Sequence, residues 1–454
     1  MMPDLDYTQP MINKRLASRL TLLLLVLSLF FSAGCDLLDR PETNLPAAEV
    51  APTAAPTTPV QPPSDVGPTP TPEATPSAQR TLIVWLPPEI GGRTQSATSL
   101  LNEQIRLFSS GYPDLQVVVQ QKNVSGPGGM LSYLRTGRSV APSVMPDLLV
   151  LPGDRLLATY NEELIQPLGG AIGSELVDAL YPAGRQVARP QEIVLGYPFA
   201  LTNITHLAYD TAVITDTFPL TFTQMLELPD STLLFPGSGT EGITIWLQLY
   251  LAHGGTVVDE NGQPTLQAQP LRLALEQLSQ ARQQGFITSQ SSNITDLNEA
   301  WQLFEEESAP IVQTSASQFL RGRVPGQIYG LAAVPGLTEP LPPLANSWVW
   351  AISTTDPARR SLAIELMTFL VQPANLAEWS QAAHVLPARA DALNEWEIDE
   401  TYRQFFDQSL QQAQPNPVAP ASQLMNVFRD AVFDVTSLTE SPAAAANSAA
   451  AVFE

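Results

Sequence analysis

The sequence TLIVWL at residues 81–86 decides the fold class, because it is a continuous apolar run that two prolines end. A short apolar run bounded in this way predicts a buried strand. A helix is expected from about Ser96, since Leu101, Ile105 and Phe108 fall on one helical face. The chain therefore enters its folded part as a strand followed by a helix.

The same alternation continues along the chain. Leu115, Val117 and Val119 recur at every second position as in a strand, a helix is predicted at residues 130–136, and PDLLVL at residues 146–151 reads as another buried strand. Strand, helix, strand, helix, strand with short connections predicts a parallel sheet covered by helices. The fold class is therefore α/β.

The second half of the folded part has similar order. Pro270 opens a predicted helix, and Asp356 is well placed to cap a helix whose first residue is Pro357. Residues 309–312 and 346–352 read as strands. Because the part from residue 78 onward exceeds the size at which one core stops growing, two lobes are expected.

Residues 1–34 have the features of a secretory signal peptide. Basic side chains precede an apolar run at residues 20–31, and small residues follow it. Such a run rises only ~18 Å as a helix, which is well short of the ~30 Å hydrocarbon layer. A permanent membrane span is therefore not expected, and the protein is predicted to be exported.

Cys35 is the single cysteine of the chain and directly follows Ser32, Ala33 and Gly34. This sequence resembles the lipobox of bacterial lipoproteins, with Ser32 where that motif usually has leucine. The resemblance implies that Cys35 is lipidated and anchors the protein at the cell membrane, on the extracytoplasmic side. The alternative is a plain signal peptide with a chance cysteine, but Cys35 has no disulfide partner in this chain.

Residues 35–80 form a predicted tether. Proline, threonine, alanine and valine dominate residues 41–77, as in PTPTP at residues 68–72. Such a composition buries too little apolar area to offset its ordering entropy, and its prolines favour an extended spacer of roughly 3 Å per residue. The tether could hold the folded part away from the lipid.

The formal net charge of the chain is −23. A strongly acidic protein repels polyanions, so nucleic acid is excluded as a partner.

Short motifs along residues 81–439 resemble, in their order, the substrate-binding lipoproteins of bacterial ABC importers. The resemblance is to the carbohydrate-binding group that includes maltose-binding protein. The motifs are IVW at 83–85, FSSGYPD at 108–114, PDLL at 146–149, GYPF at 196–199 with LAYD at 207–210, GG at 254–255 with DENG at 259–262, IYG at 328–330 with PG at 335–336, and Trp379 with LPAR at 386–389.

The resemblance implies a two-lobed, type II periplasmic-binding-protein-like fold, with hinge strands between the lobes and a ligand cleft. By analogy, the first lobe takes residues 81–206 plus 345–385, and the second takes 207–344 plus 386–440. The alanine-rich residues 441–454 are expected to be a frayed tail.

The resemblance also implies a function. The protein is expected to capture a small solute, above all a sugar or oligosaccharide, and to deliver it as a monomer to an ABC permease. Ligand that touches both lobes stabilises the closed form. A receptor that feeds a membrane sensor would have the same site, so the sequence leaves that alternative open.

Sugar sites combine flat aromatic rings with charged or amide side chains. Trp85 ends the first strand, at the carboxyl end where open α/β sheets place ligands. Asn346, Trp348 and Trp350 share one face of a predicted strand by their spacing of two. Trp246 lies early in a helix after a glycine-rich turn. For each indole, packing in the core is the alternative.

The polar candidates follow strands. Asp154 and Arg155 come after PDLLVL, where the resemblance to maltose-binding protein implies an Asp-Arg pair for sugar hydroxyls; an exposed ion pair is the alternative. Thr202 and Asn203 follow GYPF, where the family contacts ligand, and an ordinary loop is the alternative.

Two further acidic residues are candidates, and one position departs from the family pattern. Glu89 follows the first strand, and Glu241 lies at the glycine-rich turn. Met425 falls where maltose-binding protein has a stacking aromatic, which makes maltodextrin an insecure choice of ligand.

An enzyme is the main rival class. The chain has neither a G-x-S-x-G nor an H-E-x-x-H motif, and its three histidines are scattered. We therefore predict no catalytic residues, no metal site and no cofactor. A lipid-anchored glycosidase remains the least favoured alternative, because its two carboxylates need not be close in sequence.

Overall fold

The computed structural model describes residues 80–91, 94–420 and 422–454, which all belong to one compact unit, residues 75–454. The predicted signal peptide, Cys35 and all of the predicted tether except Arg80 lie outside the described residues. Arg80 is instead the first residue of a strand. Within the described part, no helix has the length and apolar character that a membrane crossing requires.

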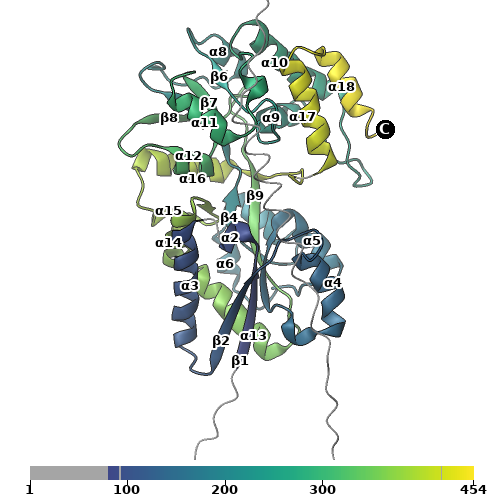
Figure 1. Cartoon of the computed structure of the whole chain (residues 1–454), viewed down its shortest axis with the longest axis vertical. Helices are drawn as coiled ribbons and strands as arrows, with labels where there is room; N and C mark the ends of the chain where they lie inside the picture. Colours follow the sequence, from purple (N-terminus) through teal and green to yellow (C-terminus); the bar gives the residue numbers. More distant parts are fainter. Residues whose placement is uncertain (1–79, 92–93, 421) are drawn as a thin grey trace, which may run out of the picture. The chain divides into compact units, whose positions relative to one another are not determined.

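Two β-sheets organise the described residues, and each sheet has helices packed against it (Figure 1). The first has the order β10-β4-β9-β3-β1-β2, with β11 also paired to β9. Its strands are β1 (Arg80–Leu86), β2 (Leu115–Gln121), β3 (Leu148–Pro152), β4 (Tyr197–Thr202), β9 (Leu344–Ile352), β10 (Leu386–Pro387) and β11 (Gln414–Pro415).

The second sheet has the order β6-β7-β5-β8. Its strands are β5 (Thr205–Asp210), β6 (Leu233–Leu234), β7 (Ile311–Ser315) and β8 (Tyr329–Ala332). In the first sheet, β1 is parallel to both β2 and β3, as the strand-helix alternation predicts. The expected two-lobed α/β fold is therefore confirmed.

The helices of the first lobe are α2 (Pro88–Gly91), α3 (Gln95–Ser110), α4 (Met130–Val140), α5 (Gly153–Asn161), α6 (Ser174–Asp178), α7 (Pro182–Ala188), α13 (Pro357–Leu370), α14 (Pro373–Ala383) and α15 (Ala390–Asn394). The second sheet is accompanied by α8 (Phe222–Leu226), α9 (Thr244–Ala252), α10 (Ala268–Gln283), α11 (Leu297–Glu305), α12 (Ala316–Gly322), α16 (Glu400–Gln412), α17 (Gln423–Thr436) and α18 (Pro442–Ala450).

Strand β1 is apolar throughout because helices cover both faces of its sheet. Leu82 and Val84 share a core with α3, α13 and α14, whereas Ile83 and Trp85 share a second core with α4 and α5. Figure 1 shows α3 on one side of β1 and β2, with α4 and α5 on the other. The period of two along the strand therefore distributes its side chains between two layers.

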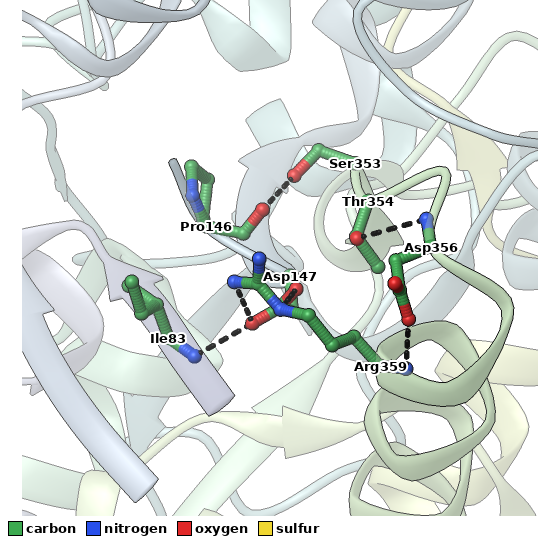
Figure 2. A network of polar contacts seen from close by, with 7 residues as sticks. All are labelled: Ile83, Pro146, Asp147, Ser353, Thr354, Asp356 and Arg359. Atoms are coloured by element: carbon green, nitrogen blue, oxygen red, sulfur yellow. Dashed lines mark hydrogen bonds and ion pairs between the residues drawn. The ribbon is translucent and has the colours of Figure 1, made fainter. Parts of the chain in front are cut away.

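Asp147 joins three elements of the first lobe (Figure 2). It directly precedes β3, its carboxylate accepts the Ile83 N–H of β1, and Arg359 of α13 forms an ion pair with it. Burial raises the pKa of Asp147, while the Ile83 N–H and Arg359 oppose that shift. The PD sequence thus supplies a buried anchor for the sheet and for α13.

The chain crosses between the lobes more than once. Strand β4 leads through Asn203 and Ile204 into β5, β8 leads into β9, and α15 leads into α16. Helix α16 bonds to both lobes: Tyr181 of the first donates its hydroxyl to Asp407 at 2.7 Å, and the Tyr329 N–H of the second donates to the Tyr402 hydroxyl at 3.0 Å.

Two predicted boundaries are wrong. Residues 386–394 belong to the first lobe, because β10 pairs with β4 and α15 packs against α14. Residues 442–450 are a helix, capped by Ser441, rather than a frayed tail. Alanines 445, 446, 449 and 450 are buried on one face of α18, against α10 and α17. Small side chains allow this close packing, which a search for large apolar residues misses.

Candidate functional site

A cavity of about 970 Å³ lies at the carboxyl ends of β1, β2, β3 and β4 and beside the amino-terminal half of the antiparallel strand β9. This is the edge where open α/β sheets bind ligands. Its polar and aromatic lining residues are Glu89, Asn123, Ser125, Asp154, Arg155, Gln186, Arg189, Thr202, Asn346, Ser347, Trp348 and Asn416. They come from segments between residues 89 and 416, so the fold rather than the local sequence assembles them.

Trp348 is the aromatic residue of the cavity lining. It lies on β9 opposite Pro152 of β3 and Ala200 of β4, and it is half-buried. Because Pro152 is the last residue of β3, this register places the indole beside the carboxyl end of that strand. The expectation that Trp348 faces the site is consistent with this placement.

Trp350, two residues further along β9, has a different environment. It is 2% exposed and stacks on Phe199, with ring centroids 5.1 Å apart and an interplanar angle of 28°. The expectation of a ligand-facing Trp350 is therefore corrected. Strand β9 runs from the cavity into the sheet interior, where Phe199 contacts both Trp350 and Trp379 of α14.

Asp154 and Arg155 occupy the first turn of α5 and line the cavity. The Asp154 carboxylate lies 3.5 Å from Arg155 Nε, and 48% of the Arg155 side chain is exposed. Burial raises the pKa of Asp154, and the charge of Arg155 opposes that shift. Both groups are thus available to hydrogen-bond a ligand.

Gly153 explains how α5 comes so close to β9. A Cβ at this position would lie 2.1 Å from Ser347 Oγ and 2.9 Å from Val187 Cγ1. A larger residue would have to displace the Ser347 and Val187 side chains. Gly153 therefore allows the start of α5, which carries Asp154 and Arg155, to lie close to β9.

Thr202 and Asn346 face each other across the β4–β9 pairing, and both line the cavity. Asn203 does not line it. Its φ of +65° is a left-handed conformation that asparagine tolerates better than most residues, and it turns the chain between β4 and β5. The structure therefore places Asn203 in the segment that connects the two lobes, between β4 and β5, rather than in the cavity lining.

Two predicted indoles lie in cores. Trp85 is 1% exposed and packs edge-on against Tyr133 of α4, because its side chain points to the α4 face of β1. Trp246 is fully buried between Phe222 and Phe235 in the core of the second lobe, because α9 is apolar on all sides. Neither residue lines the cavity, so both expectations are corrected.

Of the two further acidic candidates, Glu89 lines the cavity and Glu241 does not. Glu89 of α2 lines the cavity. Glu241 does not, because its carboxylate accepts the Leu297 N–H at the start of α11, 3.0 Å away. Met425 is buried in the second-lobe core rather than placed at the cavity.

Several lining residues were not predicted. Asn123 and Ser125 lie in the segment that follows β2, so the rule that identified Glu89 and Asp154 from strand ends also finds them. Gln186 and Arg189 come from the end of α7, and Asn416 follows β11. Those three are recognisable only once the chain is folded.

The cavity combines carboxylates, guanidinium groups, amides and hydroxyls with one indole. It can accept and donate hydrogen bonds and offer a flat apolar surface. Within the described residues, no group of three or more His, Cys, Asp or Glu is placed to hold a metal ion.

A family model described as bacterial extracellular solute-binding protein matches residues 135–403. The chain belongs to this family. Its members are binding proteins rather than enzymes, and the family places the protein outside the cytoplasm. A search of the curated proteins finds no match for this solute-binding protein.

Solved structures share its fold. The sugar-binding protein MalE from Xanthomonas citri has 16% identity and a TM-score of 0.67, covering 82% of this chain and 96% of that one. Maltose-bound MalE3 from T. maritima has 15% identity and a TM-score of 0.62, covering 82% and 98%. A cyclo/maltodextrin-binding protein complexed with maltotetraose has 16% identity and a TM-score of 0.64, covering 84% and 98%. At these identities the likeness establishes the fold of the solute-binding protein.

Proposed function

We propose that this solute-binding protein captures a sugar or oligosaccharide in the cavity and delivers it to the permease of an ABC importer. We further propose that a lipid on Cys35 holds the protein at the membrane, outside the cytoplasm.

The observation that carries the proposal is the half-buried indole of Trp348 beside the polar residues of the cavity. A sugar ring has apolar C–H faces and hydroxyl edges. Its face stacks on an aromatic ring, and its hydroxyls form strong hydrogen bonds with ionised side chains such as Asp154 and Arg155. A site for an amino acid or a metal ion has no comparable need for a flat, uncharged surface.

The size of the cavity supports an oligosaccharide. Its volume of about 970 Å³ is at the upper end of the roughly 300–1,000 Å³ that is usual for small-molecule sites. Structural relatives were solved in complex with maltose, maltotriose and maltotetraose, which are ligands of those proteins. They support a glucose oligomer as the first compound to try here.

The delivery step rests on lobe closure. A ligand held between two lobes stabilises the closed form by its differential affinity for closed over open, and a permease can recognise that form. The family, the two-lobed fold and the several chain crossings support this step.

A thermal-shift screen of the purified protein tests the ligand class. Sugars, amino acids and short peptides are compared at equal concentration. A true ligand at about one hundred times its Kd stabilises the folded state by about 2.7 kcal/mol, which raises the melting temperature. Stabilisation by amino acids or peptides and by no sugar would contradict the proposal.

The anchor has a separate test. Mass spectrometry of the N-terminal peptide from native membranes should find Cys35 as the first residue, carrying acyl chains. A Cys35→Ser variant should be released from the membrane. An unmodified Cys35 in the mature protein contradicts the anchor and leaves the binding site untouched.

A further inference from the structure

We infer that Lys122 is a positioning residue for the cavity wall formed by residues 123–125, which it holds through contacts with two aromatic rings. Its effect on ligand affinity rests on the proposed function; its effect on the wall does not.

The ammonium group of Lys122 lies over aromatic rings. Its Nζ is 4.8 Å from the ring centroid of Trp85 and 4.6 Å from that of Tyr133. No ion pair found among the described residues involves Lys122, although the chain has 45 acidic side chains. A lysine in so acidic a protein that pairs with rings rather than carboxylates indicates a specific geometric role.

The two rings belong to different elements. Trp85 is on β1 and is 1% exposed, while Tyr133 is on α4 and is 43% exposed. Their centroids lie 6.3 Å apart in an edge-to-face arrangement. A cation within about 6 Å of a ring centroid is attracted by the ring quadrupole. Lys122 therefore ties the end of β2 to both β1 and α4.

Backbone hydrogen bonds hold the segment that follows Lys122 at its ends and within it. The Lys122 N–H donates to the Leu86 carbonyl at 2.9 Å, and the Met130 and Leu131 N–H groups donate to the Asn123 and Val124 carbonyls at 2.8 and 3.3 Å. The Gly129 N–H donates to the Gly126 carbonyl at 3.0 Å. Within this segment, Gly126 and Gly128 have φ values of +90° and +74°. Glycines give such a segment many alternative conformations, so an additional contact at its base restricts it substantially.

This segment is part of the binding site, because Asn123, Val124 and Ser125 line the cavity. A wall that is ordered before binding spares the ligand the entropy of ordering it. If the cation is lost, the wall becomes mobile and the affinity falls, while the core under Trp85 stays packed.

Matched variants separate the cation from the shape of the side chain. Lys122→Arg keeps the positive charge. Lys122→Met keeps an unbranched apolar side chain but removes the positive charge. Tyr133→Phe keeps the ring, and Tyr133→Leu removes it. Lys122 is the single lysine after residue 14. Its NMR signal can therefore be observed with lysine that is labelled with ¹³C at Cε. The signal that disappears in Lys122→Arg is assigned to Lys122.

The Lys122 Hε signal should be shifted upfield by the rings in the unmodified protein and in Tyr133→Phe, and should move toward the free-lysine position in Tyr133→Leu. Amide hydrogen exchange at Met130 and Leu131 should be faster in Lys122→Met than in Lys122→Arg. An unshifted lysine signal, or equal exchange in the two Lys122 variants, overturns the inference whether or not the ligand is a sugar.

Affinity gives the readout that a purely structural role would not change. With a sugar that passes the thermal-shift screen, Kd should rise about tenfold in Lys122→Met and Tyr133→Leu, at unchanged melting temperature. Lys122→Arg and Tyr133→Phe should stay within about twofold of the unmodified protein. Equal affinities in the two Lys122 variants contradict the positioning role. If no sugar binds at all, the proposed function fails, and hydrogen exchange still decides the role of Lys122 in the wall.

Discussion

The guanidinium of Arg359 contacts the carboxylate of Asp147 at both oxygens: Nη2 donates a hydrogen bond to Oδ2 at 2.8 Å, and Nε forms an ion pair with Oδ1 at 2.8 Å. The Asp147 side chain is fully buried, whereas 31% of the Arg359 side chain is exposed. The two residues are 212 positions apart in the chain. The pair therefore connects α13 to the strands that carry the cavity (Figure 2).

Replacement of Arg359 by methionine should destabilise the protein by about 3 kcal/mol, because it leaves a buried carboxylate without its cation. Denaturant unfolding at pH 7 measures this change. Arg106→Met, which breaks the exposed pair with Glu103, is the matched control and should leave the free energy of unfolding nearly unchanged. Equal effects of the two substitutions would show that the buried pair contributes nothing special.

The effect of Arg359→Met should shrink in acid. Burial raises the pKa of Asp147 above 3.8, so the folded protein binds this proton more tightly than the unfolded chain. Stability due to this group therefore rises as the pH falls toward 3.8, and removing Arg359 strengthens that trend. Unfolding free energies at pH 7 and 4.5 test this. A difference between variant and unmodified protein that is the same at both pH values contradicts it.

His206 should make the protein lose stability in acid. Complete burial among Phe319, Phe405 and Phe406 lowers its pKa from 6.5 to about 4. The unfolded chain takes up the proton below pH 6.5 while the folded protein does not until about pH 4. The shift corresponds to roughly 3 kcal/mol, lost as the pH falls through this window.

A His206→Gln variant removes this titration. The free energy of unfolding, measured between pH 7 and 4, should depend on pH less steeply in the variant than in the unmodified protein. Parallel curves would mean that His206 does not carry the acid sensitivity.

Trp348 and Trp350 should have opposite mutant phenotypes. Trp348→Leu removes the stacking surface of the cavity, so sugar affinity should fall about tenfold at a nearly unchanged melting temperature. Trp350→Leu opens space against Phe199, so stability should fall by about 3 kcal/mol. Calorimetric titration and thermal unfolding of both variants measure this contrast. Loss of affinity in Trp350→Leu alone, with full stability, contradicts the assignment.

Trp348 and Trp350 also show which features of the site can be predicted from the sequence and which cannot. Periodicity places both on one face of a strand, and the structure confirms the strand. Periodicity does not predict which residues of the strand line the cavity and which lie in the core, because the neighbouring helices and strands determine the burial of each position. Asp154, Arg155, Thr202 and Asn346 were predicted and do line the cavity, because strand ends are readable from sequence. Gln186 and Asn416 were not readable, because their segments reach the cavity only through long-range packing.

The corrected C-terminal tail is open to a direct test. Truncation after Glu440 removes α18, which exposes the faces of α10 and α17 that it covers, so the melting temperature should fall by several degrees. Removal of the exposed Glu454 alone is the control and should have little effect. An unchanged melting temperature after the longer truncation would support a frayed tail after all.

The most direct measurement is a crystal structure of the protein with the best sugar from the screen. We predict ligand density in the cavity, with a sugar ring stacked on the indole of Trp348 and hydroxyl groups within hydrogen-bond distance of Asp154 or Arg155. Sugar density at any other place on the protein, with this cavity filled by water alone, would contradict the account.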